Sequence, residues 1–172
     1  MSCPSSLWSL LLVALAGVVL LQLPWMSSTD VMESLAAREP SPSMIEAWKV
    51  AVVTVEFEGA TVHPSVLATR FDKPVHMVTA WNPGAVEREP EVNARASAEL
   101  KAELEDKKLP IFPGVGRDAA SSWEEPGFAI VGLSRADIKD IGRRYGQVAV
   151  YEFNPDSTKS IVWCVGDLVV QI

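Results

Sequence analysis

Two amphipathic segments, each followed by a pair of short apolar runs, constrain most strongly what this chain can fold into. The first is predicted as a helix over residues 90–107. Pro90 suits its first turn, because the missing N–H would have no partner inside the helix there. Apolar side chains recur at every fourth residue along this segment: Val92, Ala96, Leu100 and Leu104. The spacing predicts one narrow core-facing stripe, with charged residues on the opposite face.

The second helix is predicted over residues 135–145, and the residues at both of its ends agree with this. Ser134 is a natural N-cap, and Asp137 follows three residues later, as in a capping box. Gly146 comes directly after the helix, where a left-handed residue commonly ends one. The predicted core-facing stripe consists of Ile138, Ile141 and Tyr145.

Six apolar runs around these helices are predicted as strands: 50–57, 76–80, 109–115, 127–133, 147–153 and 159–165. The run 109–115 carries two prolines, which favours an edge position in the sheet. The turn residues at 154–157 predict a hairpin between the last two runs.

The order of these elements predicts an α+β fold. Residues 76–153 follow the split β-α-β-β-α-β pattern of a ferredoxin-like core, in which two helices cover one face of a mostly antiparallel sheet. The strands at 50–57 and 159–165 would flank and extend this core. We therefore expect a single α+β domain over residues 44–172, preceded by a polar linker at 27–43.

Residues 1–26 form an apolar leader, and three interpretations of it remain open. The stretch 7–25 has no charged residue and is near the minimum length for a membrane-spanning helix. It also fits a signal peptide, although no basic residue precedes it. Finally, Met44 stands where the folded domain is expected to begin, which fits a misplaced start codon. The protein is membrane-anchored if 7–25 is translated and retained, and cytoplasmic if translation starts near Met44.

Charge and composition narrow the function classes. The net charge of −7 argues against binding to nucleic acid, which requires a concentrated basic surface. The two cysteines do not form a disulfide scaffold, and His63 and His76 have no metal-ligand spacing. We therefore predict no metal site and no cofactor.

Three short blocks are predicted to meet at one rim of the sheet. The block "TAWNP" ends the first strand of the core, "SWEEPGF" begins the third, and "YGQ" begins the fourth. Because the first strand lies between antiparallel neighbours, its end meets their beginnings. Aromatic walls with a few polar groups suit a small ligand. The candidate ligand-binding residues at this rim are Thr79, Trp81, Asn82, Asn93, Trp123, Glu124, Glu125 and Gln147.

Structural interpretations of the same residues stand beside this one. Trp81 and Trp123 would also cap an open end of the core, and Asn82 before Pro83 is a common turn residue. Glu124 and Glu125 are adjacent, so an extended chain points their side chains to opposite faces.

The blocks also resemble a known family. "TAWNP", Asn93 in the following helix, "GRD...SSWEEPGFAIVGLS" (116–134) and "IGRRYGQVAVYEF" (141–153) are similar to a mostly bacterial family catalogued as domain of unknown function 3293. The likeness covers roughly residues 45–165. It implies domain boundaries and no particular chemistry.

The sequence favours a non-enzymatic α+β module that binds a small ligand or a protein partner at this rim. The alternative is a hydrolase or transferase that uses Glu124 or Glu125. No serine or cysteine stands in a nucleophile elbow, and no glycine-rich phosphate loop precedes a helix. A third possibility is an assembly role, in which an exposed edge strand pairs with another copy.

Overall fold

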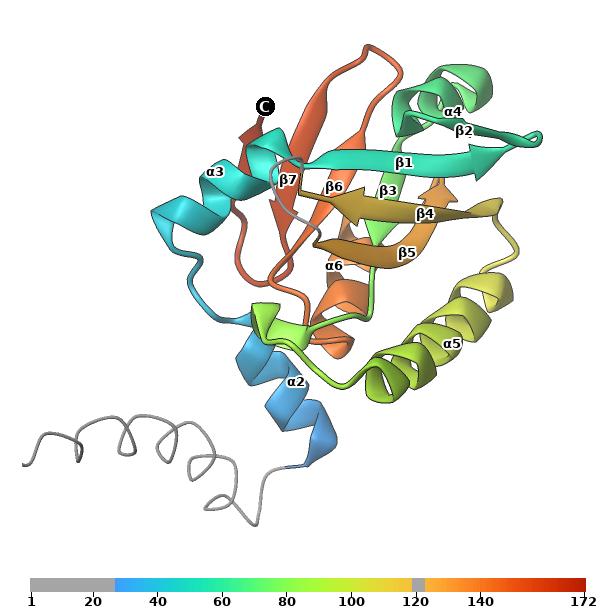
Figure 1. The fold of residues 1–172 in the computed structure, drawn as a ribbon. Helices are drawn as coiled ribbons and strands as arrows, with labels where there is room; N and C mark the ends of the chain where they lie inside the picture. The colour runs from blue at the N-terminus through green and yellow to red at the C-terminus, as the bar shows by residue number, and fades with distance from the viewer. Residues whose placement is uncertain (1–26, 119–122) are drawn as a thin grey trace, which may run out of the picture.

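A single antiparallel sheet organises the residues that the structure, a computed structural model, describes, namely 27–118 and 123–172 (Figure 1). Within these residues eight strands pair in the order β2-β1-β4-β5-β3-β6-β7-β8. The strands are β1 (Val52–Phe57), β2 (Ala60–Val62), β3 (Val75–Val78), β4 (Ile111–Arg117), β5 (Glu124–Val131), β6 (Ala149–Phe153), β7 (Lys159–Trp163) and β8 (Val169–Gln171). Every neighbouring pair is antiparallel.

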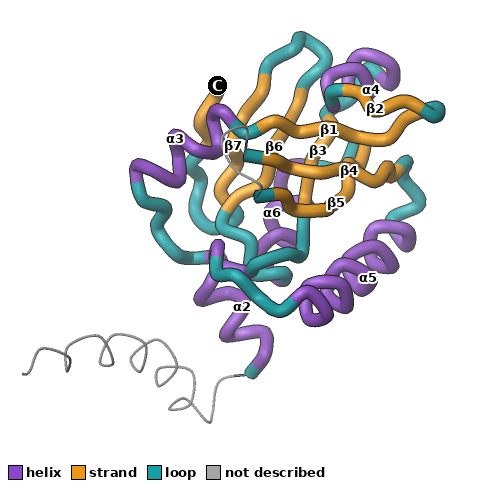
Figure 2. The backbone as a smooth tube through the Cα atoms, in the orientation of Figure 1, coloured by secondary structure: helices purple, strands orange, loops and turns teal. Residues whose placement is uncertain are grey.

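Helices cover both faces of this sheet (Figure 2). They are α2 (Ser28–Ala36), α3 (Pro42–Val50), α4 (Pro64–Phe71), α5 (Pro90–Asp106) and α6 (Arg135–Arg144), with a 3-10 turn η2 (Pro83–Ala85). Helices α5 and α6 pack on the face that carries Val78 of β3. Helix α4 packs on the face that carries Met77, and α3 packs on that same face over β7. Successive strand residues point to opposite faces, so β3 contributes to both cores.

The two helices predicted from the sequence are present, and the expected N-cap serine and the glycine after the last turn are in place at α6. Ser134 Oγ accepts a hydrogen bond from the Asp137 backbone N–H at 3.1 Å, and Gly146 adopts a left-handed φ of 67° after α6. The expected stripe on α5 is wrong at Val92, which is 54% exposed. The first turn of α5 faces the loop after β3 instead of the sheet, and Asn93 is the buried side chain there.

The predicted edge position of the run 109–115 is also wrong, because β4 lies between β1 and β5. The strand accommodates its two prolines because both lie outside the part of β4 that pairs with β1. Pro110 precedes the strand, and pairing with β1 begins only at Gly114. Pro113 therefore lies where β4 has a partner on one side alone, so its missing N–H costs no bond to β1.

The α+β class is confirmed, and the hairpin between β6 and β7 is present. Helices α3 and α4 were not predicted, and α2 lies within the stretch predicted as a linker. Ala36 of α2 is buried, and Arg143 of α6 pairs with Glu33 of α2. In the described part of the chain no helix has the length and apolar character to cross a bilayer. The apolar leader lies outside that part.

Candidate functional site

The three sequence blocks lie together where β3 ends and β5 and β6 begin. Thr79 Oγ1 donates a hydrogen bond to the carbonyl oxygen of Pro126 at 2.6 Å. Gln147 Nε2 donates to the carbonyl oxygen of Trp81 at 2.8 Å. Hydrogen bonds between the three blocks therefore tie the strand ends to one another across the rim.

Asn82 and Asn93 form the polar centre of this rim. Asn82 has a left-handed φ of 48°, which asparagine tolerates better than most residues. Its backbone N–H donates to Asn93 Oδ1 at 3.0 Å, and its Oδ1 accepts from Asn93 Nδ2 at 2.9 Å and from the Arg88 N–H at 3.1 Å. Asn82 Nδ2 donates to Glu125 Oε1 at 2.8 Å. The two amides are thus occupied in shaping the loop and in holding Glu125.

A cavity of about 590 Å³ opens beside this network, between the rim and α3. All eight residues predicted from the sequence border it. Four aromatic side chains from separate elements contribute to its wall: Trp48, Trp81, Trp123 and Tyr151. Its volume falls within the range of about 300–1,000 Å³ that is typical of small-ligand sites.

Glu125 is the acidic group whose properties the cavity changes most. Burial raises its pKa from an ordinary 4.5 to about 7, and the hydrogen bond from Asn82 only partly opposes this. At neutral pH the carboxyl group therefore exchanges a proton readily, which is the condition for acid–base chemistry or for proton-linked binding.

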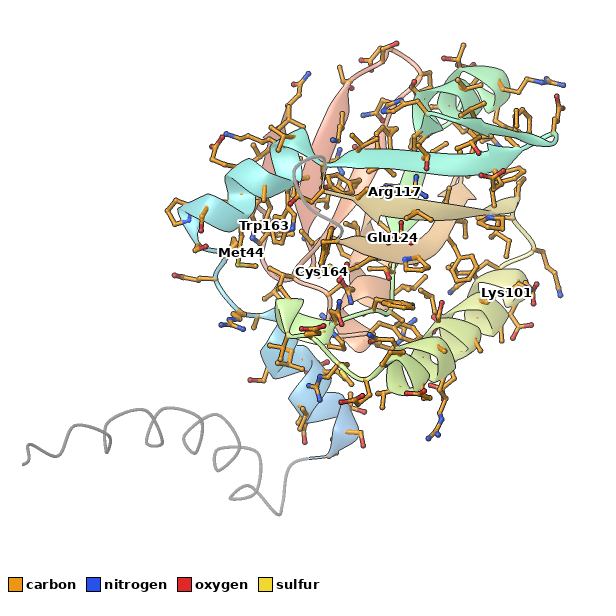
Figure 3. All side chains as sticks on the ribbon, viewed as in Figure 1. Met44, Lys101, Arg117, Glu124, Trp163 and Cys164 are labelled. Carbon is orange, nitrogen blue, oxygen red and sulfur yellow. The ribbon has the colours of Figure 1, made fainter. Side chains whose placement is uncertain are left out.

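Glu124 has a different environment from its neighbour. Its side chain is exposed and accepts a hydrogen bond from Arg117 Nε at 3.0 Å across β4 and β5 (Figure 3). The adjacent glutamates thus do not act as a carboxylate pair, as the alternation of an extended chain predicts.

Helix α3 is fixed over the cavity by contacts that the sequence did not reveal. Tyr151 Oη donates to the carbonyl oxygen of Trp48 at 2.8 Å. The Trp48 ring meets Trp163 edge to face, with centroids 5.9 Å apart. Burial, with a smaller contribution from the Glu125 charge, raises the pKa of Tyr151, so its hydroxyl stays neutral. Lys159 Nζ lies 4.7 Å from the centre of the Tyr151 ring.

Arg88 is a cavity residue that sequence analysis missed. Its backbone N–H and carbonyl are held by the side chains of Asn82 and Asn93. Its Nε is buried and has no hydrogen-bond partner among the described residues. No sequence pattern marked it, because one arginine in a charged segment before a helix resembles an ordinary surface residue. Trp48 was missed because only the packing of α3 brings it to the cavity, and Tyr151 because it lies within β6, after the YGQ block.

Potential metal ligands do not gather at this site. Across residues 27–118 and 123–172, no three side chains of His, Cys, Asp or Glu are grouped so that they would hold a metal ion.

Fold and cavity together define the class: an α+β domain with one antiparallel sheet, helices on both faces and a ligand-sized cavity at one rim. Residues 78–150 match the model of a family described as "Protein of unknown function (DUF3293)". The resemblance seen in the sequence blocks is thereby confirmed for this segment. No curated protein and no solved structure matches the chain. The matched segment contains all eight predicted site residues and Arg88, whereas Trp48 lies outside it.

Proposed function

We propose that this domain binds a small polar ligand in the cavity at the rim of the sheet. The observation that carries the proposal is the cavity of about 590 Å³ to which all three sequence blocks contribute. Its walls combine aromatic rings with a small number of polar groups, the composition expected of a ligand site.

The hydrogen bonds divide the cavity residues into two roles. Thr79, Asn82, Asn93 and Gln147 are tied to neighbouring backbone or side chains, so they set the shape of the rim. Among the described residues, the Glu125 carboxylate accepts one hydrogen bond, and the Arg88 Nε–H donates none. These two charged groups retain the capacity to contact a ligand.

We also interpret β3, β4, β5 and β6, with α5 and α6, as a ferredoxin-like core. The order β4-β5-β3-β6, antiparallel throughout, supports this interpretation. The packing of both helices on one face supports it as well. In this description the ligand site lies at the end of the central strand of the core.

The test is a thermal-shift and tryptophan-fluorescence screen of the full chain against small metabolites. Ala51 borders the cavity, so Ala51→Phe should place a ring in it and weaken the response to any hit. The control is Ala47→Phe, which places the same ring on an exposed position of α3 away from the cavity. A hit that binds Ala51→Phe as well as wild type would overturn the proposal, as would a screen with no hit.

A second candidate function is catalysis by Glu125 as a general acid or base, in a hydrolase or transferase. Its pKa of about 7 favours this candidate, because proton transfer is most effective near the working pH. Hits from the screen should be incubated with wild type and with Glu125→Gln and followed by mass spectrometry. Turnover by wild type alone, with binding kept in the variant, would establish an enzyme. An unchanged hit in both samples would exclude this candidate for that compound.

A further inference from the structure

The cavity holds charge of both signs, and the two signs are not paired with each other. Glu125 and Arg88 both border it and are partly buried, whereas Glu87, which also borders it, is exposed. Within the described part of the chain, neither Glu125 nor Glu87 forms a salt bridge with Arg88. A folded protein ordinarily pairs charged groups that it removes from water, so this arrangement calls for an external partner.

Arg88 is held in position while part of its side chain lacks a partner. Asn82 Oδ1 accepts from its backbone N–H, and Asn93 Nδ2 donates to its carbonyl oxygen at 3.3 Å. The guanidinium Nε is buried without a hydrogen bond among the described residues. The fork of a guanidinium matches the two oxygens of a carboxylate, which would supply the missing acceptor.

Glu125 offers the complementary group. Asn82 Nδ2 binds its Oε1, so the same amide that fixes the Arg88 backbone also orients this carboxylate. Asn82 therefore links the backbone of Arg88 to the carboxylate of Glu125, and both residues border the cavity. A ligand ammonium beside Glu125 would be favoured by charge and would add donors to a carboxyl group that has few.

The aromatic walls also favour a cation in the cavity. Trp48, Trp81 and Tyr151 border the cavity, and aromatic faces attract ammonium groups.

A ligand with a single charge satisfies only half of these groups. A simple amine would leave the buried Arg88 Nε without an acceptor, and a simple acid would lie near Glu125 and Glu87. We propose that the ligand is a small zwitterion of the amino-acid type, with its carboxylate at Arg88 and its ammonium at Glu125. This inference rests on the proposed function and specifies the chemistry of that same site.

Isothermal titration calorimetry on the full chain with matched probes tests the proposal. One set is L-phenylalanine, 2-phenylethylamine, 3-phenylpropanoate and 3-phenylpropanol, which share a ring and differ in charge. A second set is glycine betaine, choline, 3,3-dimethylbutanoate and 3,3-dimethylbutanol, which replaces the primary ammonium by a methylated one. In at least one set the zwitterion should bind about tenfold more tightly than each of its analogues, as expected for one added charged contact.

Two variants assign the charges of the better zwitterion. Arg88→Gln should weaken its binding about tenfold and leave the matching amine unchanged, because the amine lacks the carboxylate. Glu125→Gln should weaken the zwitterion and the amine by similar factors and leave the acid unchanged. Arg95→Gln and Glu91→Gln are the controls, since both residues are exposed on α5 and do not border the cavity. Thermal unfolding of each variant verifies that it is folded.

Several results would overturn the inference. These are a singly charged or neutral analogue that binds as tightly as the zwitterion, an Arg88→Gln variant that weakens amine and zwitterion equally, and no binding in either set. The metabolite screen separates this failure from failure of the proposed function. A hit of another charge type that Ala51→Phe blocks would retain the binding function and reject the zwitterion.

Discussion

Glu125 and Glu152 lie on the two strands that flank β3, yet the protein gives their carboxyl groups opposite properties. Glu152 is 3% exposed and is surrounded by donors, with His76 Nε2 at 2.9 Å, Arg135 Nε at 3.0 Å and Asn154 Nδ2 at 3.3 Å. These hydrogen bonds, that of His76 first, hold its pKa well below the usual range. Among the described residues Glu125 has one donor, and burial raises its pKa to about 7.

The difference shows that burial alone does not decide what a carboxylate does. A buried carboxylate with enough donors stays ionised and becomes part of the framework, as Glu152 does between β3, β6 and the start of α6. One with too few donors keeps a proton near neutral pH and can respond to a ligand, as expected of Glu125. The four predictions that follow test this contrast, from the largest effect on stability to the smallest.

Glu152→Gln should lower the free energy of unfolding by about 3 kcal/mol at pH 7, because it leaves His76 and Arg135 without their charged acceptor. Urea denaturation measures this loss. The carboxylate contributes stability above its unfolded-state pKa, and this contribution disappears as the pH falls through the lowered folded-state value. The difference in the free energy of unfolding between variant and wild type should therefore become smaller in acid. A difference that does not change with pH would show that the variant loses packing and not a charge interaction.

Asn93→Ala should lower the free energy of unfolding by about 2 kcal/mol. Asn93 is 2% exposed, and its loss leaves the Asn82 N–H without an acceptor. The Glu125 pKa should rise further, since Asn82 would no longer be held beside it. Urea denaturation and a carbon-13 NMR titration of the glutamate side chains test both effects. A stability loss with an unchanged Glu125 pKa would show that Asn82 orients this carboxylate without help from Asn93.

Glu125→Gln should have an effect of the opposite sign. It should raise the free energy of unfolding by about 1–2 kcal/mol at pH 8. The folded-state pKa of about 7 lies above the ordinary 4.5, so the wild type loses stability as the pH rises through that interval. At pH 4 both forms carry a neutral group, and the difference should vanish. Urea denaturation at the two pH values measures it, and the NMR titration should give a midpoint near 7 for Glu125. Destabilisation by this variant at pH 8 would contradict the contrast with Glu152.

Glu124→Gln should change the free energy of unfolding by no more than about 0.5 kcal/mol, because its salt bridge with Arg117 is solvent-exposed. Urea denaturation measures this change. The variant is a control for Glu125→Gln, because it makes the same substitution at the neighbouring position. A loss above about 1 kcal/mol would show that the exposed pair contributes more than surface pairs usually do.

Much of the fold was predictable because its information is local. Helix α6 carries its own start and stop residues, Ser134 and Gly146, and these act within one or two turns of chain. The meeting of the three blocks at one rim was also predictable, since antiparallel neighbours of a central strand begin where it ends. The location of the candidate site therefore followed from element order alone.

Two predictions were wrong, the edge position of the run 109–115 and the burial of Val92, because each depends on how distant parts of the chain pack. Strand β4 has the prolines of an edge strand, but β1 pairs with it beyond Pro113 and makes it interior. Val92 has the spacing of a core residue, but its helix turn extends past the sheet and leaves it exposed. Neither the pairing of β4 nor the exposure of Val92 can be derived from the local sequence pattern, because each depends on where a distant segment packs.

The sequence by itself determined the ends of α5 and α6, the α+β class, and the eight polar and aromatic residues that element order gathers at one rim. Local hydrogen bonds and hydrophobic period are sufficient for these. Only the tertiary structure decided that α3 closes a cavity over that rim and that Arg88 borders it, with a buried Nε that has no hydrogen-bond partner among the described residues. It also decided that Glu125 titrates near neutral pH whereas Glu152 stays ionised. The reason is physical: the charge state of a buried group depends on which donors surround it in space, and those donors come from distant parts of the chain.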